Sequence, residues 1–249
     1  MYLKSSALLS LAATTSAFNL PSPKHLFSNP DASTTDFNIP TVHESAVQAR
    51  RILRLESIGT LSTIFPSTPH ATERRPSDVA GAPIGLMDYY GDCEPETGNP
   101  TILAITIATS FKNVDAGSNI TLSLRWHPQD STWRSPASLP RFSLVGRLED
   151  LTSDDLKNNP LVPACYLKYH PDAAAWLPGN RIHQSKWVRL VVEEVYWIGG
   201  FGDRAYIGWI PKDEWNGVTK DEIESIRLPG EKKGWGGWRE WVGLGQVEL

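Results

Sequence analysis

Residues 185–211 constrain the fold of this 249-residue chain more than any other segment. Residues 187–197 are mostly Val, Leu, Tyr and Trp, which suit a pleated, half-buried strand, and residues 205–210 repeat this character. The two runs flank Gly199, Gly200 and Gly202, and glycine permits positive φ angles and close backbone approach. We therefore predict two strands at a glycine corner, which is either a bend or a place where a ligand or partner comes near.

The rest of the pattern predicts a mainly β domain with flanking helices. Many short strands at roughly regular spacing favour a barrel or a sandwich. Besides the two strands above, we expect strands at residues 58–64, 84–90, 101–108, 120–126 and 141–148.

Helices are predicted on both sides of the strand region. Thr41 and Glu44 have the spacing of a capping box, and a helix should run from there to about residue 57. Its apolar residues share one face, and they are Ala46, Ala49, Ile52 and Leu53. Further helix is expected within residues 153–176 and 221–227.

The N-terminus has the features of a secretory signal peptide, which we place at residues 1–17. Lys4 precedes a short apolar stretch, and Thr15 and Ala17 are small residues before the expected cleavage site. No later segment reaches about 18 uninterrupted apolar residues, so no membrane span is expected. The protein should be secreted, or delivered to a vacuolar or lysosomal lumen; the alternative is a cytosolic protein with an apolar N-terminus.

Two further features depend on that compartment. Asn119 begins an Asn-Ile-Thr sequon, which predicts glycosylation in the secretory pathway. Cys93 and Cys165 are the only cysteines of the sequence, and they are 72 residues apart. They form either a disulfide or two buried free thiols, and the sequence leaves both alternatives open.

Composition changes along the chain suggest four parts. After the signal peptide, residues 18–40 are rich in Pro, Ser and Asn and should form a flexible leader. The ordered domain is placed at 41–215, followed by a Trp- and Gly-rich extension at 216–249. Trp235, Trp238 and Trp241 would form one stripe on a helix, which either docks on the domain or contacts carbohydrate or membrane.

Composition and motifs exclude several functions. The net charge of −4 and the scattered basic residues argue against nucleic-acid binding. The six histidines have no metal-ligand spacing, and there is no nucleophile elbow or Walker loop. We assign no catalytic residue and no metal site.

Two pairs of polar residues nevertheless stand out. His170 and Asp172 are either an acid/base pair or, as we favour, the end of one helix and the cap of the next turn. Glu193 and Glu194 interrupt an apolar strand, so period two should turn one of them inward. Arg189, on the face of Glu193, is the expected ion-pair partner.

The order of the motifs resembles a known family. The motifs are GTLST, a strand after Pro-Ile-Gly, a strand ending in Ser110-Phe111-Lys112-Asn113, the sequon strand, Tyr-His-Pro-Asp and the aromatic strand with its Gly-Gly corner. Over residues 43–215 the chain resembles the CREG-like branch of the pyridoxamine 5′-phosphate oxidase-like split β-barrels. This resemblance implies a split barrel that forms a homodimer.

In flavin-binding relatives, FMN lies in a groove at the dimer interface. The resemblance places the FMN phosphate at Thr109, Ser110 and Lys112, with residues 85–88 along the ring system. The oxidases also carry an Arg and a Lys on one strand, and here the matching IGLMDYYGD has neither. Asp88 and Asp92 would leave a dianionic phosphate poorly compensated. The resemblance therefore implies a barrel without cofactor, because CREG-type relatives are generally regarded as having lost the flavin.

The leading hypothesis is a secreted, glycosylated, dimeric CREG-like barrel without enzymatic activity, which binds an unknown protein or small molecule. The alternative is an FMN-dependent oxidoreductase of the same fold.

Overall fold

The computed structural model describes residues 38–68, 74–181, 183–202 and 204–232. The expected signal peptide, residues 18–37 of the leader and the three tail tryptophans, Trp235, Trp238 and Trp241, lie outside the described residues. None of the helices within the described ranges is long and apolar enough to cross a bilayer.

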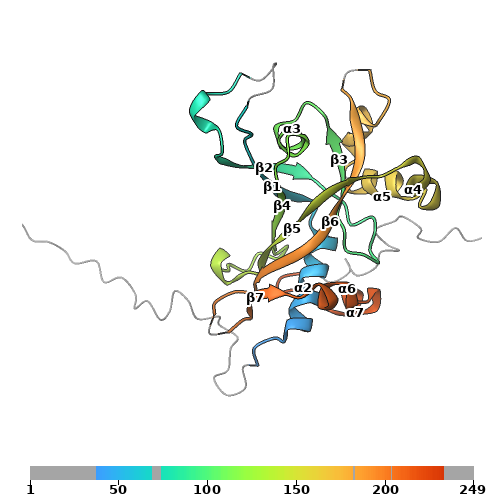
Figure 1. Ribbon diagram of the computed structural model, residues 1–249. Coiled ribbons are helices and arrows are strands. Elements are labelled where there is room, and N and C mark those ends of the chain that lie inside the picture. Colours follow the sequence, from blue (N-terminus) through green and yellow to red (C-terminus); the bar gives the residue numbers. More distant parts are fainter. Residues whose placement is uncertain (1–37, 69–73, 182, 203, 233–249) are drawn as a thin grey trace, which may run out of the picture.

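Seven antiparallel strands form one sheet that curls into a barrel (Figure 1). The order along the sheet is β2-β1-β4-β5-β6-β3, and β7 also pairs with β6. Each strand lies where the sequence predicted one, with ends shifted by up to three residues. The strands are β1 (Ile58–Ile64), β2 (Pro83–Tyr89), β3 (Thr101–Ile105), β4 (Ile120–Arg125), β5 (Arg141–Asp150), β6 (Ser185–Ile198) and β7 (Ile207–Ile210).

The barrel closes because β6 pairs with three strands and a short β-bridge joins the ends of the sheet, β2 and β3. β6 pairs with β5 along most of its length, with β3 through its first residues and with β7 through its last four. Just after β2, Gly91 exchanges backbone hydrogen bonds of 2.9 and 2.8 Å with Thr101 of β3. The glycine corner of the sequence is thus the bend between β6 and β7, where Gly199 donates to the carbonyl of Tyr206.

A β-bulge interrupts the long β5–β6 pair. Val145 pairs with Glu194 and Gly146 pairs with Val192, so Glu193 is the extra residue. Glu193 and Glu194 are both exposed, which makes the prediction of one inward carboxylate wrong. The bulge shifts the alternation by one residue, because Val192 and Val195 both face the core. Glu193 pairs with Arg147 at 2.8 Å rather than with Arg189.

Helix α2 (Val42–Leu55) packs against the barrel, and both of its sequence signals are confirmed. Thr41 and Glu44 form the capping box, with hydrogen bonds of 3.1 and 2.7 Å. The four apolar residues of the predicted stripe are all fully buried: Ala46, Ala49, Ile52 and Leu53. They join the core formed by the inner faces of the strands, which includes Leu122, Leu144 and Trp197.

Three arginines of α2 fasten distant segments to the helix. Arg50 is fully buried and donates to the carbonyls of Trp215, at 2.9 Å, and Pro95. Arg51 pairs with the buried carboxylate of Glu231. Arg54 pairs with Asp92 at 2.7 Å, and both side chains are largely buried. Two of the three buried guanidinium groups, those of Arg51 and Arg54, are thus paired with a carboxylate, which offsets part of the cost of burying a charge.

The segment after residue 215 continues into the same core. Helices α6 (Lys212–Gly217) and α7 (Lys220–Ser225) both contact α2, and they lie beside it in Figure 1. Val218, Ile223 and Leu228 belong to the buried cluster of the barrel. Residues 216–232 thus pack with the domain that we expected to end at residue 215.

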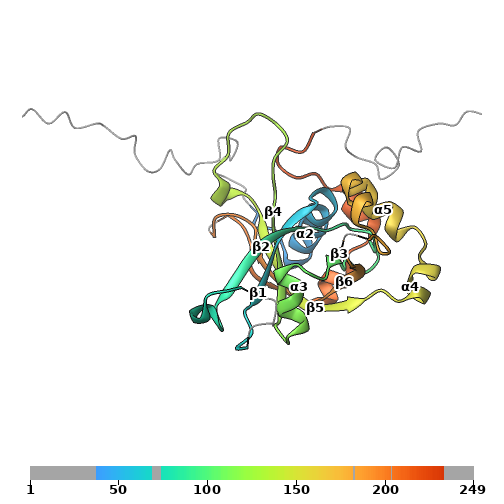
Figure 2. The same ribbon diagram turned by 90° about the horizontal axis from the view of Figure 1, so that it is seen from above.

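Helices also occupy the connections between strands (Figure 2). The segment 153–176 contains helix as predicted, with α4 (Ser153–Asn158), α5 (Val162–Tyr169) and the 3-10 helix η3 (Pro171–Trp176). Two further 3-10 turns are η1 (Ser77–Val79) and η2 (Pro136–Ser138). Cys93 and Cys165 form a disulfide, which ties the segment after β2 to α5 and decides between the two alternatives. In the chain-entropy model such a loop contributes about 4 kcal/mol.

His43 links the three helices at the end of the barrel. Its Nδ1 lies 2.8 Å from Glu214 of α6, and its Nε2 lies 2.8 Å from Glu222 of α7. Both ring nitrogens can donate to carboxylates only when the imidazole is protonated. These hydrogen bonds, led by Glu222, raise the pKa of His43. The hydrogen bond from His43 lowers the pKa of Glu222 to about 2.

We expect Gly146→Ala to destabilise the barrel strongly. A Cβ at position 146 would stand 2.0 Å from the carbonyl oxygen of Val191, so the β5–β6 pair would have to separate. Steric overpacking of this kind should cost about 3 kcal/mol. Urea denaturation measures the loss, with Gly217→Ala as control because a Cβ there meets nothing within 4 Å. Equal unfolding midpoints for the two variants would contradict the role of Gly146.

The His43 contacts predict a pH-dependent contribution to stability. Because the pKa of His43 is raised, its stabilisation is complete below the ordinary value of 6.5 and is lost as pH rises through the folded pKa. Because the pKa of Glu222 is lowered, its stabilisation is present above the ordinary value of 4.5 and is lost toward pH 2.

His43→Gln should therefore lower stability most between these two ordinary values, by at most about 1 kcal/mol, because the three side chains are partly solvent-exposed. Thermal unfolding across a pH series measures the difference. His183→Gln is the control, since no described carboxylate contacts that ring. A His43 effect that stays constant into alkaline pH would be evidence against the protonated contact.

Candidate functional site

His170 and Asp172 take structural roles in the barrel. His170 is buried at the end of α5, and its Nε2 donates to the carbonyl of Tyr90 at 2.9 Å. The ring stacks on Tyr89 at 4.0 Å, and the Tyr89 hydroxyl donates to Asp172 at 3.0 Å. Burial lowers the pKa of His170. The imidazole is thus a packing group at the end of α5, as the structural alternative expected. Asp172, however, does not cap the next turn: it lies inside η3 (Pro171–Trp176), whose cap forms no side-chain hydrogen bond.

The residues assigned to an FMN phosphate lie in helix α3 (Thr109–Asp115), not at the end of a strand. The predicted strand 101–108 stops at Ile105, and the segment Ser110-Phe111-Lys112-Asn113 is helical, which corrects the strand assignment. Ser110 is 2% exposed, so its hydroxyl is turned away from solvent. Of the three assigned side chains, Thr109 and Lys112 expose surface. Asp92 is paired with Arg54, which removes one of the negative charges expected to oppose a phosphate. With Ser110 buried, Thr109 and Lys112 are the two members of the assigned set that could reach a phosphate.

The other predicted positions have clear places in the fold. Asn119 is exposed immediately before β4, where an attached glycan would point into solvent. Trp187 and Trp197 are buried, whereas Trp209 is 54% exposed. Within the described ranges, no group of three or more His, Cys, Asp or Glu side chains is arranged to hold a metal ion.

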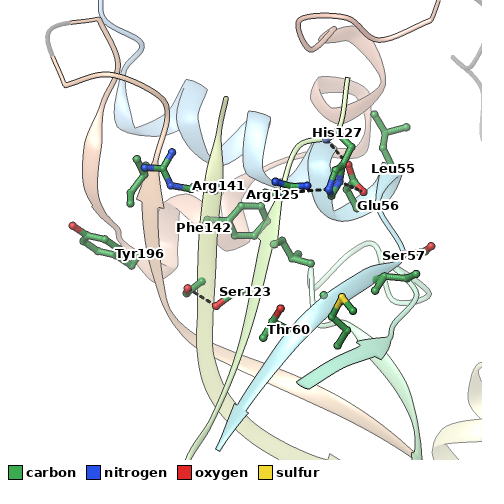
Figure 3. A pocket seen from close by; sticks show the side chains of 16 residues that line it. Leu55, Glu56, Ser57, Thr60, Ser123, Arg125, His127, Arg141, Phe142 and Tyr196 are labelled. Atoms are coloured by element: carbon green, nitrogen blue, oxygen red, sulfur yellow. Dashed lines mark hydrogen bonds and ion pairs between the residues drawn. The ribbon is translucent and has the colours of Figure 1, made fainter. Parts of the chain in front are cut away.

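The outer face of the sheet carries a groove that no single motif predicted (Figure 3). We call it the outer groove; it is open to solvent and has a volume of about 760 Å³. Residues from the end of α2 and from strands β1, β2, β4, β5 and β6 line it. They are Leu55, Glu56, Ser57, Ile58, Gly59, Thr60, Met87, Ser123, Leu124, Arg125, His127, Arg141, Phe142, Ser143, Tyr196 and Ile198. Thr109, Ser110 and Lys112 are outside this set.

Hydroxyl groups form the floor of the outer groove. Thr60 of β1, Ser123 of β4 and Ser143 of β5 lie on neighbouring strands, and Thr60 pairs with Ser123 while Ser123 pairs with Ser143. The two serine hydroxyls hydrogen-bond to each other at 2.8 Å. The floor therefore offers small polar groups that a ligand can contact without a steric barrier.

Apolar side chains border the groove on two sides. Met87 of β2 is 80% exposed beside Thr60, its partner in the register. On the opposite side, Tyr196 of β6 packs edge to face against Trp209 of β7, with ring centroids 5.1 Å apart. Large exposed apolar groups around a polar floor mark a surface for binding.

Charged residues gather at one end of the groove. Glu56 accepts two hydrogen bonds from His127, from its backbone N–H at 2.7 Å and from Nδ1 at 2.9 Å. The other ring nitrogen, Nε2, accepts a hydrogen bond of 2.7 Å from Nε of Arg125. His127 therefore lies between a carboxylate and a guanidinium, and Arg141 stands on the next strand.

One signal in the sequence could have located the floor. Residues 58–64 and 120–125 alternate apolar residues with Ser and Thr, so one face of each strand is hydroxyl-bearing. The charged end had no such signal, because Glu56, Arg125 and Arg141 come from three elements separated by loops.

Comparisons with known proteins agree on the fold. The family described as CREG, beta-barrel matches residues 40–217. The heme-binding protein from Mycobacterium smegmatis aligns with a TM-score of 0.54 at 19% identity, covering 72% of this chain and 62% of that chain.

Two further structures are more distant. The heme storage protein HutZ from Vibrio cholerae has a TM-score of 0.44 at 14% identity, with 64% of this chain and 95% of that chain covered. For a putative pyridoxamine 5′-phosphate oxidase from Listeria innocua, the TM-score is 0.38 at 10% identity and the coverage 62% and 98%.

No curated protein matches the sequence at a significant level. The family match spans more than half of the chain and coincides with the barrel described above. The alignment with the Mycobacterium smegmatis protein is a likeness of fold. The chain therefore belongs to the CREG β-barrel family.

Proposed function

We propose that this protein is a secreted, glycosylated binding protein without catalytic activity, whose ligand occupies the outer groove. The observation that carries the proposal is the groove itself, with its hydroxyl floor, apolar borders and volume of about 760 Å³. Sites of this size and mixed lining are typical of small-molecule binding. The proposal concerns the groove and not the residues in α3.

The hydrogen bonds of the His127 ring support binding rather than catalysis. A histidine that acts as general base needs a free acceptor nitrogen facing the substrate proton. In His127 that nitrogen, Nε2, already accepts from Arg125 at 2.7 Å, while Nδ1 is bound to Glu56. Both ring nitrogens of His127 are therefore occupied by structural contacts at the end of the groove.

The disulfide and the sequon support a secretory route. A disulfide between Cys93 and Cys165 suits an oxidising compartment better than the cytosol. Asn119 is exposed, as glycan attachment requires. Both features agree with the signal peptide expected at residues 1–17.

Apolar residues beside the groove support a homodimer. Met87, Ile207 and Trp209 are 80%, 42% and 54% exposed, and Tyr196 connects Trp209 to the groove. Aromatic and methionine side chains are enriched in protein interfaces. On this proposal, a second copy covers the apolar borders.

We expect the wild-type chain to have the mass of a dimer in light scattering at micromolar concentration. The double variant Met87→Asp, Trp209→Asp should have the mass of a monomer, because two charges would be buried unpaired in the interface. Leu161→Asp is the matched control, since Leu161 is 64% exposed at the start of α5, away from the groove. A monomeric wild type would argue against the dimer.

Protein collected from the medium of a eukaryotic secretory host should be colourless. Ser110 is buried and the Arg and Lys of the oxidases are missing from IGLMDYYGD, so no flavin band is expected in its absorption spectrum, and added FMN should not be retained. The measurement is a visible spectrum before and after incubation with FMN and desalting. A yellow protein would favour the flavin-dependent alternative, and absence of the protein from the medium would contradict secretion.

A further inference from the structure

Two arginines face each other across strands at the charged end of the outer groove. Arg125, the last residue of β4, is the direct register partner of Arg141, the first residue of β5. Both also line an adjoining hollow of about 450 Å³ beside η2. Like charges directly opposite on antiparallel strands destabilise a sheet. The pair is thus a local cost that folding alone does not explain.

Neither arginine has an acidic partner among the described residues. Arg125 donates to Nε2 of His127, and Arg141 makes two long hydrogen bonds to the carbonyls of Ala137 and Leu139, at 3.3 and 3.5 Å. Figure 3 shows the two side chains pointing away from each other. Each guanidinium is thus oriented by its own hydrogen bonds, and neither forms an ion pair with a described carboxylate.

Other arginines of the same sheet are paired. Arg147 of β5 contacts Glu193 and Glu149, at 2.8 and 3.4 Å. Arg189 of β6 lies 3.2 to 3.7 Å from carboxylates on three different elements, Glu94, Glu149 and Asp155. The sheet therefore neutralises its arginines elsewhere, and the groove is where two of them lack an acidic partner within the described part of the chain.

Glu56 does not supply the missing negative charge. It lines the groove, but both of its oxygens accept from His127. The two guanidinium groups of Arg125 and Arg141 carry two positive charges, and Glu56 carries one negative charge. This end of the groove therefore has an excess of positive charge. An oxyanion would complete the set, because guanidinium binds carboxylate and phosphate through paired hydrogen bonds.

We propose that Arg125 and Arg141 bind the oxyanion, a phosphate or a carboxylate, of a ligand whose apolar or aromatic body lies along the outer groove. Tyr196 and Met87 border the space for that body, and the hydroxyls of Ser123 and Ser143 lie beneath it. This inference rests on the proposed function and adds the chemical class of the ligand.

Two fluorescent probes of similar shape separate the anion from the apolar body. The first is 8-anilinonaphthalene-1-sulfonate, which joins an aromatic body to an oxyanion, and the second is the neutral N-phenyl-1-naphthylamine. Both are titrated into the full chain as wild type and as Arg125→Gln, Arg141→Gln. The matched control is Arg147→Gln, which removes an arginine of the same sheet from outside the groove.

The double variant should bind the sulfonate at least about tenfold more weakly, since two charged hydrogen-bonding groups are lost. Its affinity for the neutral probe should stay within about twofold of wild type. Arg147→Gln should behave as wild type with both probes, and Arg125→Lys, Arg141→Lys should recover part of the sulfonate affinity because it keeps the charge.

Equal sulfonate affinity in the wild type and the folded double variant would overturn the oxyanion site while leaving a groove that binds the neutral probe. If the wild type binds neither probe, the proposed function fails as well. These two failures are distinguishable in one set of titrations.

Competition on the wild type keeps the inference testable if the double variant does not fold. Phenyl phosphate or benzoate should displace the sulfonate probe, and benzyl alcohol should not. The stronger of the two anions identifies phosphate or carboxylate as the preferred group. Displacement by benzyl alcohol as effective as by both anions would overturn the site.

Discussion

The contact between the backbone of Gly146 and that of Val191 determines the geometry of the barrel and of its outer face. No side chain fits at position 146, and the bulge formed there shifts the alternation of β6 by one residue. Val188, Leu190 and Val192 face inward before the bulge, and Val195 and Trp197 do so after it. Without this shift, Glu194 would enter the core and Trp197 would leave it. The bulge is therefore what turns Tyr196 outward, onto the border of the groove.

The buried arginines of α2 connect this barrel to the segments that close it. Arg54 holds Asp92 next to Cys93, so an ion pair and a disulfide fix the same short segment after β2. That segment contains Gly91, whose bridge to Thr101 closes the sheet. Burying such pairs is costly in desolvation, and breaking one partner leaves an uncompensated charge. Closure of the barrel thus depends on polar contacts as much as on the apolar core.

Local signals in the sequence predicted the elements but not these long-range contacts. The capping box at Thr41 and the apolar stripe after it depend on neighbours three or four residues apart, so they were readable. The prediction that a strand ends in Ser110-Phe111-Lys112-Asn113 is wrong, because the apolar run from Thr101 continues to Ala108 and hides the start of α3. One of Glu193 and Glu194 was predicted to point inward, which is wrong because a β-bulge interrupts the alternation of side chains along β6. The residue that accommodates the bulge, Gly146, lies on the neighbouring strand β5.

The partners of the α2 arginines could not be inferred for a related reason. Arg50 and Arg51 stand in a run that reads as a solvated helix face, yet they contact Trp215 and Glu231, more than 160 residues away. The charged end of the groove is equally dispersed, since Glu56, Arg125 and Arg141 meet only after the sheet has formed. The hydroxyl floor was not predicted either, although its Ser and Thr residues repeat along single strands and could have been found from the sequence.

Because side chains alternate along each strand, the two faces of the sheet differ in chemistry. The inner face is apolar and packs on α2, whereas the outer face places hydroxyls between apolar borders. Ser123 and Ser143 satisfy each other, so covering them with a partner or ligand costs less than burying unpaired hydroxyls. The arginine end is the opposite case, because two guanidinium groups without acidic partners would resist burial. A second copy is therefore expected to cover the apolar borders, while the arginine end stays open until an anion neutralises it.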